Sequence, residues 1–209
     1  MSAEKTVKVA VLVSGGGTNL QALIDAQVAG IIKHGAIRLV VSNNPNAYAL
    51  TRAKNAGIST AVIPGKGMAQ DEFEARLVSL LEENEIDLIV LAGFMRILSA
   101  DFTARYPRRI INVHPSLIPS FCGKGFYGLR VHEEALRYGV KVTGATVHFV
   151  NEIPDGGEII LQKAVNIQKN DTPEILQKRV MVKAEWIILP RALEKVCREY
   201  YSKRKEFCK

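Results

Sequence analysis

The chain has 209 residues, of which 47% are hydrophobic and 23% are charged. This length and composition suit one domain over residues 1–209, and they exclude a membrane-spanning chain. Because the start of the chain also lacks a secretory signal, we expect a cytoplasmic protein. The net charge of +7 favours anionic partners, but much of the excess lies in the tail, from about 200 to 209, which we expect to be basic and frayed and no nucleic-acid site.

The first two thirds of the chain alternate short apolar runs with helical patterns. We expect buried strands at 7–14, 37–43, 59–64, 87–94 and 109–115. Helices are expected after each of the first three strands, and Gly57 marks the C′ position of the second helix. Apolar strands separated by helices are typical of a parallel sheet that is covered on both faces.

The last third has a different rhythm. Two strands, 144–150 and 157–167, are expected to form a hairpin-like pair, and a long helix follows from about 173 to 198, with Thr172–Pro173 as its start signal. We therefore predict an α/β fold: a mostly parallel twisted sheet with helices on both faces and an antiparallel strand pair towards the C-terminus. In such sheets ligands bind at the carboxyl ends of the strands.

The first expected strand ends in a glycine-rich stretch, SGGGTNLQ, from Ser14 to Gln21. Glycines let backbone N–H groups approach a phosphate, and the start of the following helix favours an anion. The stretch is not a Walker A sequence, and Leu20 stands where a dinucleotide fingerprint has its third glycine. A tight strand–helix turn is the alternative, and we favour phosphate binding.

A second glycine-rich stretch, GKGFYG from Gly123 to Gly128, matches the pattern G-x-G-x-x-G. It does not directly follow a strand, so we expect a flexible loop instead of a nucleotide site. A loop of this kind beside a catalytic residue can move as a lid.

Asn112 and His114 lie at the end of the fifth expected strand, in the stretch INVHPSLIP. They share one face because side chains alternate along a strand. An amide and an imidazole together can polarise a carbonyl group placed between them. Asp155 alone would be an ordinary Asp-Gly turn residue, but beside this pair it would raise the imidazole pKa and share a proton with it.

The other candidate positions are more ambiguous. Met95 to Leu98 follow the fourth expected strand and would form either a wall for a flat, mostly apolar ligand with an acidic end, or ordinary core packing. His132 and His148 are expected to be packed or surface histidines, because their spacing does not resemble a metal site, and we expect no metal. The cysteines form no CxxC pair, and no GxSxG elbow is present, so we expect neither a disulfide framework nor a covalent intermediate.

The sequence resembles the folate-dependent formyltransferase family over nearly its whole length. The matching segments are VLVSGGGTNLQAL, VVSNNPNAYALTRAKNAGI, DLIVLAGFMRIL, IINVHPSLIPSF, GVKVTGATVHFVNEIPDGGEII and AEWIILP. SGGGTNLQ narrows the resemblance to the phosphoribosylglycinamide formyltransferase branch. The resemblance implies a Rossmann-like formyltransferase fold, and transfer of a formyl group from 10-formyltetrahydrofolate to the amine of glycinamide ribonucleotide in purine biosynthesis, by direct attack through a tetrahedral intermediate.

The resemblance also implies roles for individual residues. The catalytic residues would be Asn112, His114 and Asp155. The ribonucleotide site would comprise Gly17, Thr18, Asn19 and Glu185, although Glu185 alone is as compatible with a helix salt bridge. The donor site would comprise Gln70, Met95, Arg96, Ile97, Leu98, Asn112, Asn151, Glu152, Ile153, Pro154 and Asp155.

Two departures from the family pattern stand out. Gln70 occupies a position where some members carry an arginine near the folate end, which puts charge recognition there in doubt. Cys122 stands where proline is frequent, which leaves the mobility of the following loop open.

Several alternatives stay open. A methionyl-tRNA formyltransferase usually carries a further C-terminal domain, and a formyltetrahydrofolate deformylase usually carries a further N-terminal domain, so we prefer neither assignment. Deformylation and a catalytically silent nucleotide-binding module remain the alternatives. The expected partners are the two small-molecule substrates, without nucleic acid or membrane, and the protein is expected to be either a monomer or a homodimer.

Overall fold

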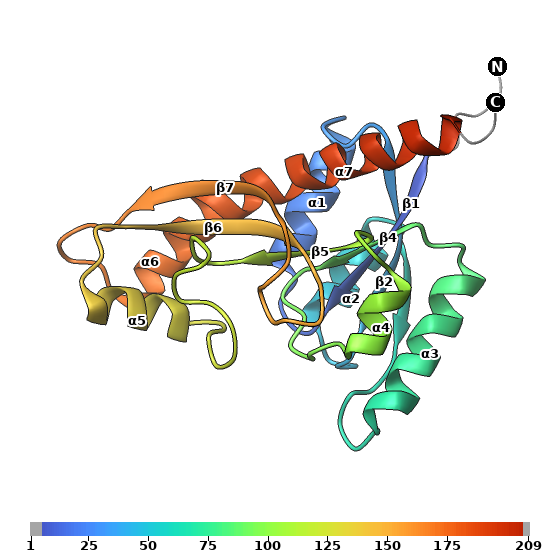
Figure 1. The fold of residues 1–209 in the computed structure, drawn as a ribbon, viewed down its shortest axis with the longest axis horizontal. Helices are drawn as coiled ribbons and strands as arrows, with labels where there is room; N and C mark the ends of the chain where they lie inside the picture. The colour runs from blue at the N-terminus through green and yellow to red at the C-terminus, as the bar shows by residue number, and fades with distance from the viewer. Residues whose placement is uncertain (1–5, 207–209) are drawn as a thin grey trace.

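The computed structural model describes residues 6–206, which form a seven-stranded sheet flanked by helices (Figure 1). The strand order is β3-β2-β1-β4-β5-β6-β7. Neighbouring strands are parallel from β3 to β5, whereas β6 pairs antiparallel with both β5 and β7. The predicted fold class is therefore confirmed, including the antiparallel pair.

The bounds of the elements follow the predicted order. The strands are β1 (Val7–Val13), β2 (Gly35–Ser42), β3 (Ser59–Val62), β4 (Leu88–Leu91), β5 (Ile110–His114), β6 (Val142–Phe149) and β7 (Ile159–Asn166). The helices are α1 (Thr18–Val28), α2 (Tyr48–Asn55), α3 (Gln70–Glu83), α4 (Ala100–Arg105), α5 (Arg130–Tyr138), α6 (Pro173–Val180) and α7 (Trp186–Glu206). A short π-helical segment, η1 (Met181–Glu185), joins α6 to α7, and we call it the π-turn.

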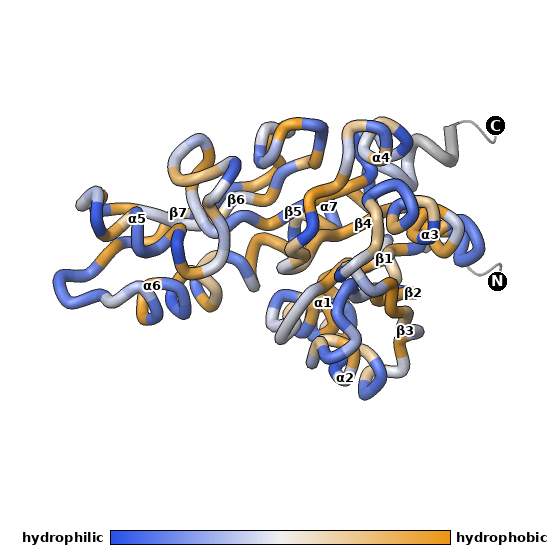
Figure 2. The backbone as a smooth tube through the Cα atoms, turned by 90° about the horizontal axis from the view of Figure 1, so that it is seen from below, coloured by the Kyte–Doolittle hydropathy of each residue, from blue (hydrophilic) through white to orange (hydrophobic). Residues whose placement is uncertain are grey.

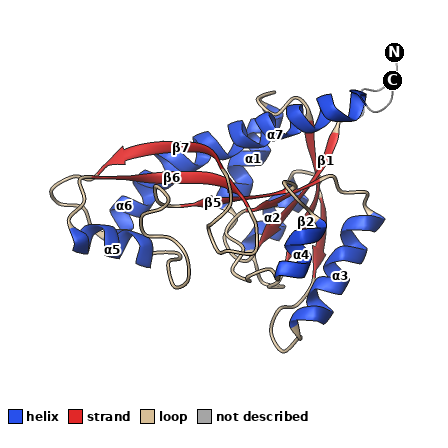
Figure 3. Ribbon diagram, in the orientation of Figure 1, coloured by secondary structure: helices blue, strands red, loops and turns tan. Residues whose placement is uncertain are grey.

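The sheet buries apolar side chains on both faces because they alternate along each strand. In β1, Val9 and Val11 face one core, which is shared with α1, α2, α6 and α7. Ala10 and Leu12 face the other core, which is shared with α3 and α4. Figure 3 shows the helices on both sides of the strands, and Figure 2 shows hydrophobic stretches along the central strands.

The C-terminal helix starts as predicted but ends later than predicted. Its start is as expected, since Pro173 takes the first position and the Thr172 side chain accepts a hydrogen bond from Ile175 N. It does not end near 198 but continues as α7 to Glu206, so the tail that we expected to be frayed from about 200 is helical as far as it is described. Positions 207–209 lie outside the described residues. Tyr200 packs against the core, which explains why the helix continues.

Helices α4 and α5 were not predicted. Each is short, with six residues in α4 and nine in α5, so the hydrophobic period has little length in which to repeat. The Ser99 side chain caps α4 by accepting a hydrogen bond from Phe102 N.

Candidate functional site

Asn112, His114 and Asp155 meet at the carboxyl end of β5. Asn112 and His114 lie on this strand, and Asp155 comes from the loop between β6 and β7. Asn112 Nδ2 donates to Asp155 Oδ1 at 3.5 Å, and His114 Nδ1 lies 3.4 Å from Asp155 Oδ2. The structure thus brings together an amide, an imidazole and a carboxylate that are up to 43 residues apart in the sequence.

The His114 imidazole is buried and held from both sides. Its Nε2 lies 2.8 Å from the carbonyl oxygen of Phe121 and must donate to it, because a carbonyl oxygen only accepts. Burial lowers the pKa of His114, and it outweighs Asp155 and the Phe121 carbonyl, which raise it. Asp155 therefore acts in the expected direction, but the ring is neutral at neutral pH in this state.

Asp155 is the centre of the hydrogen-bond network. Burial raises the pKa of this carboxyl, but His148, His114 and the backbone N–H of Gly123 stabilise the charged form more strongly, so the pKa is lowered overall. Gly123 N donates to Oδ2 at 2.9 Å. Asp155 also has a φ of 57°, in the left-handed region that aspartate tolerates better than most residues. The carboxylate is thus ionised at neutral pH and held by groups on β5, on β6 and at the start of the Gly123 loop.

His148 belongs to this network, which the sequence did not reveal. It is buried, as a packed histidine would be, but it also lies directly opposite Asn112 in the β5–β6 pairing. Its Nδ1 donates to the Phe149 carbonyl at 2.8 Å, and its Nε2 lies 3.2 Å from Asn112 Nδ2. The same Nε2 lies 3.5 Å from Asp155 Oδ1. The only sequence signal was the place of His148 on a strand that precedes the Asp155 turn.

A cavity of about 690 Å³ opens beside these residues, and we call it the site pocket. It is large enough to hold a drug-sized ligand. Ten of the residues assigned by the resemblance line it: Thr18, Asn19, Met95, Arg96, Ile97, Asn112, His114, Pro154, Asp155 and Glu185. The other six do not line it: Gly17, Gln70, Leu98, Asn151, Glu152 and Ile153.

One end of the site pocket is formed by α1 and the π-turn. Asn19 Nδ2 donates to Glu185 Oε2 at 2.7 Å, across 166 residues of sequence. Burial raises the pKa of Glu185 to about 7, although the hydrogen bond from Asn19 opposes the rise. Gln177 and Met181 line the same end and were not predicted. Glu185 is therefore a buried acid that faces a cavity, and it forms no salt bridge of the helix surface kind among the described residues.

The other end of the site pocket is the segment after β4. Arg96 is fixed there by hydrogen bonds to the carbonyl oxygens of Gly65, at 2.8 Å, and Met68, at 3.2 Å. Its Nε donates to Gln70 Oε1 at 2.9 Å, and Gln70 in turn donates to the Ile97 carbonyl. Gln70 therefore lies behind the wall of the site pocket and holds it in place.

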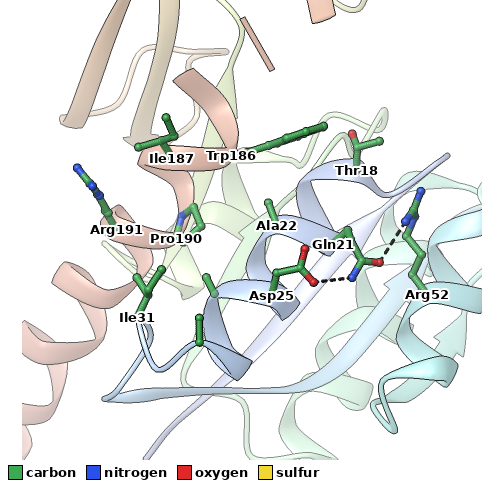
Figure 4. A pocket seen from close by; sticks show the side chains of 12 residues that line it. Thr18, Gln21, Ala22, Asp25, Ile31, Arg52, Trp186, Ile187, Pro190 and Arg191 are labelled. Atoms are coloured by element: carbon green, nitrogen blue, oxygen red, sulfur yellow. Dashed lines mark hydrogen bonds between the residues drawn. The ribbon is translucent and has the colours of Figure 1, made fainter. Parts of the chain in front are cut away.

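The glycine-rich turn before α1 is tightly braced. Gly17 has a φ of 72°, and a Cβ atom there would lie 2.6 Å from Ala49 Cβ, so only glycine fits without a shift. Arg52 Nε donates to the Gly16 carbonyl at 2.8 Å. Figure 4 shows Arg52 bonded to Gln21, at the edge of a smaller cavity of about 490 Å³ between α1 and α7. The turn is thus a preformed structure that presents the start of α1 to the site pocket.

The second glycine-rich stretch, Gly123 to Gly128, is a loop without helix or strand, as predicted. It lines the site pocket. Through Phe121 O and Gly123 N, the segment directly around its start contacts both His114 and Asp155. Movement of this loop would therefore change the hydrogen bonds of both side chains.

His132 is the least expected member of the site pocket lining. It lies on α5, it is fully buried, and neither ring nitrogen has a hydrogen-bond partner among the described residues. Burial, and to a lesser extent the neighbouring His114, lowers its pKa to about 4, so the ring is neutral. A packed position was one of the two that we expected for His132, but its proximity to His114 was not predicted.

The described residues contain neither a metal-binding cluster nor a membrane-spanning helix. Between residues 6 and 206 no three His, Cys, Asp or Glu side chains are grouped in a way that could hold a metal ion. In the same range, no helix combines the length and the apolar character needed to cross a membrane.

Comparison with known proteins places this geometry in a family. Residues 7–193 match the family model described as formyl transferase. The trifunctional purine biosynthetic protein adenosine-3 of Homo sapiens is 46% identical over 194 residues, which cover 92% of this chain and 18% of that protein. The phosphoribosylglycinamide formyltransferase of Haemophilus influenzae is 42% identical over 188 residues, covering 90% of this chain and 85% of the relative.

Solved structures agree with these relatives. Glycinamide ribonucleotide transformylase 1 from Symbiobacterium toebii has a TM-score of 0.86 and 38% identity, covering 93% of this chain and 89% of that one. The chain spans less than a fifth of the trifunctional relatives but most of the bacterial ones. Because the family model extends from β1 into α7, the chain belongs to the formyl transferase family.

Proposed function

We propose that the protein transfers a formyl group from 10-formyltetrahydrofolate to the amine of glycinamide ribonucleotide, in purine biosynthesis. The observation that carries the proposal is the meeting of Asn112, His114 and Asp155 beside a pocket with two chemically different ends. The names of the relatives support it, since the Haemophilus influenzae and Symbiobacterium toebii proteins are named for this activity. We also place the reaction in the cytoplasm, with the two small molecules as the partners.

The two ends of the site pocket suit the two substrates. The Asn19–Glu185 end offers a buried carboxylate as acceptor for ribose hydroxyl groups, and the start of α1 offers backbone N–H groups to a phosphate. The opposite end, from Met95 to Ile97, has an exposed apolar surface that suits the flat ring system of the donor. The loop that carries Pro154 and Asp155 would close over the donor from the β6–β7 side.

Asn112 and His114 would stabilise the charge that develops on the formyl oxygen. When the ribonucleotide amine attacks the formyl carbon, the carbonyl oxygen becomes an oxyanion. His114 Nε2–H now donates to the Phe121 carbonyl, and the formyl oxygen would take that place. Asn112 Nδ2 would supply the second hydrogen bond. Donors of this kind contribute about 10²- to 10³-fold each to the rate.

Asp155 would assist the transfer of a proton from the attacking amine to the leaving nitrogen. The attacking amine must lose a proton, and the leaving folate nitrogen must gain one. The neutral His114 ring can accept that proton, and the ionised Asp155, 3.4 Å from Nδ1, would stabilise the resulting imidazolium until the proton passes on. Binding both substrates side by side supplies the positioning.

The test is a mass-resolved product assay with 10-formyltetrahydrofolate, with and without glycinamide ribonucleotide. We expect formylated ribonucleotide only when both substrates are present. His114→Ala should lower kcat by about 10²- to 10³-fold, because one oxyanion donor and the proton acceptor are lost. His34→Ala, a half-buried histidine that pairs with Glu194 far from the site pocket, is the matched control.

The same assay separates the alternatives. Formate release that is independent of the ribonucleotide would assign the protein to deformylation. Donor binding without any product would favour a catalytically silent module. Near wild-type turnover by His114→Ala would contradict the proposed roles of the site residues.

A further inference from the structure

The smaller cavity between α1 and α7, of about 490 Å³, has a lining that is almost entirely its own. We call it the α1–α7 pocket. Among the described residues, Thr18 alone lines both this cavity and the site pocket. The volume suits a drug-sized ligand. The reaction proposed above makes no use of this cavity.

The walls of the α1–α7 pocket are mostly apolar. Ala22 and Ala26 of α1 and Ala29 just after it lie on one face, because residues three or four apart are neighbours on a helix. Their small side chains leave space beside the helix. Ile187 and Pro190 of α7 form the opposite wall (Figure 4). The cavity is therefore a slot between two apolar walls, which suits a planar aromatic ring.

Arg191 supplies the α1–α7 pocket with a cation that has no acid partner. It is exposed on α7, and none of the ion pairs found between residues 6 and 206 involves it. Arg52, on the other side of the pocket in Figure 4, is already engaged by the Gly16 carbonyl and by Gln21 Oε1. Arg191 is thus the guanidinium that can bind an anionic group through two parallel hydrogen bonds.

Two other polar groups of the lining have capacity for a ligand. Asp25 is exposed and accepts a hydrogen bond from Gln21 Nε2 at 2.8 Å through one of its oxygens, which leaves further acceptor sites on the carboxylate. Trp186 Nε1 is buried and has no hydrogen-bond partner in the part of the chain that the structure describes. An amino group on a ligand would match Asp25, and an acceptor atom would match the indole N–H.

The α1–α7 pocket adjoins the ribonucleotide end of the site pocket. Its lining residue Thr18 directly precedes Asn19, and its lining residue Trp186 directly follows Glu185. Asn19 and Glu185 are the hydrogen-bonded pair of that end. A ligand that contacts both α1 and α7 would therefore fix the two segments that carry this pair, and a fixed pair loses less conformational freedom when the ribonucleotide binds.

We propose that the α1–α7 pocket binds a planar aromatic molecule that carries an amino group and an anionic group, and that its binding strengthens the binding of the ribonucleotide. The ring lies in the slot, the amino group donates to Asp25, and Arg191 binds the anionic group. A nucleoside monophosphate and an aromatic carboxylate share this chemistry. The binding of this molecule does not depend on the proposed function, whereas its effect on the ribonucleotide rests on it.

Trp186 makes the binding measurable, because it is the single tryptophan of the chain and lines the pocket. The experiment follows its fluorescence during titration with AMP and, separately, with 4-aminobenzoate. We expect a saturable change. A change with AMP identifies the nucleotide as the source of the ligand chemistry, and a change with 4-aminobenzoate alone identifies the carboxylate.

Three variants locate the bound probe. Arg191→Gln should weaken its binding by about tenfold, because a hydrogen bond between charged groups is lost. Ala22→Leu should abolish the binding by filling the slot, and the surface change Arg191→Gln stays informative if Ala22→Leu does not fold. Arg198→Gln is the matched control, since Arg198 is another exposed arginine of α7 and lines neither cavity, and it should bind the probe as the wild type does.

The kinetic part of the experiment measures the ribonucleotide KM at increasing probe concentration. The KM should fall by about fivefold and then level off, and Arg191→Gln should need about tenfold more probe for the same effect. A probe that competes in the site pocket would instead raise the KM in proportion to its concentration. A KM that rises or stays constant at saturation would therefore overturn the inference.

Two fluorescence results would also overturn it. One is the absence of a change with both probes, and the other is a change that Arg191→Gln and Ala22→Leu leave intact, which would place the probe elsewhere. Failure of the proposed function looks different, because no formylated ribonucleotide would then form, while the fluorescence titration needs no turnover.

Discussion

Glu185 is an acidic residue in an unusual environment for a carboxyl group. It is almost completely buried, at the end of a π-turn, with Asn19 as its hydrogen-bond donor. π-turns are rare and frequently occur at functional sites. With a pKa of about 7, the side chain is half protonated at neutral pH before any ligand binds. A carboxylate accepts hydrogen bonds from ribose hydroxyls better than the neutral acid does.

The ribonucleotide KM should therefore depend on pH through Glu185. As the pH falls below about 7, the acid becomes protonated and the KM should rise, whereas above pH 8 it should level off. Glu185→Gln should raise the KM by about 10- to 100-fold, which corresponds to a lost hydrogen bond to a charged group, and should flatten the pH dependence. Initial-rate measurements between pH 6 and 8.5 check this.

The control for Glu185 is Glu174→Gln, which changes an exposed acid in the first turn of α6. It should leave the ribonucleotide KM at the wild-type value. An unchanged pH profile in Glu185→Gln would mean that another group controls ribonucleotide binding.

At the scale of elements, α1 and its glycine turn show how a short segment is fixed by a distant one. Gly17 is the residue before α1, and it packs against Ala49 of α2. Glycine meets both requirements of this position, a positive φ and close approach of the backbone to Ala49, because it has no Cβ atom. The position of the α1 start, and so of any phosphate bound there, depends on the packing of α1 against α2.

Gly17→Ala should lower the free energy of unfolding by about 2 kcal/mol or more, because the left-handed conformation costs about 1–2 kcal/mol and the Cβ clash adds to it. It should also raise the ribonucleotide KM. Urea unfolding and initial rates measure both effects. Gly16→Ala is the control, since open space surrounds a Cβ at that position. Equal stability of the two variants would show that the turn adapts.

At the scale of the whole molecule, the strand order decides where the site lies. The chain runs outwards from β1 to β3 and then returns to β4 on the other side of β1. Ligands bind in such sheets where the strand order reverses, at the carboxyl ends. The loops after β1, β4 and β5 meet there, and the loop between β6 and β7 and the π-turn complete the site pocket.

Global stability should fall on acidification because of His132. Between pH 6.5 and about 4 the unfolded chain binds a proton at this residue and the folded chain does not, so stability is complete above pH 6.5 and decreases as the pH falls. Protonation of His132 in the unfolded chain should lower the free energy of unfolding by about 3 kcal/mol over this range. His132→Leu should reduce the loss, as urea unfolding at pH 7 and pH 4.5 would show. The same pH dependence in both proteins would contradict this assignment.

The sequence by itself determined the fold class and the catalytic candidates. The alternation of apolar residues in β1 and the Thr172–Pro173 helix start are local patterns, and they predicted the corresponding elements. Asn112 and His114 could be paired because two positions along one strand always share a face. The Asp-Gly turn after the next strand suggested Asp155 as their partner, and the resemblance to a family then supported it and added Glu185.

Only the tertiary structure decided which distant groups meet and in which state they are. It brought His148 and His132 beside the catalytic candidates, placed Gln70 behind Arg96, and buried His114 so that its pKa is lowered. Such contacts depend on strand order and register, and burial depends on every element packed around a group. A local pattern encodes neither, because its period describes a single element and carries no information about the neighbours of that element.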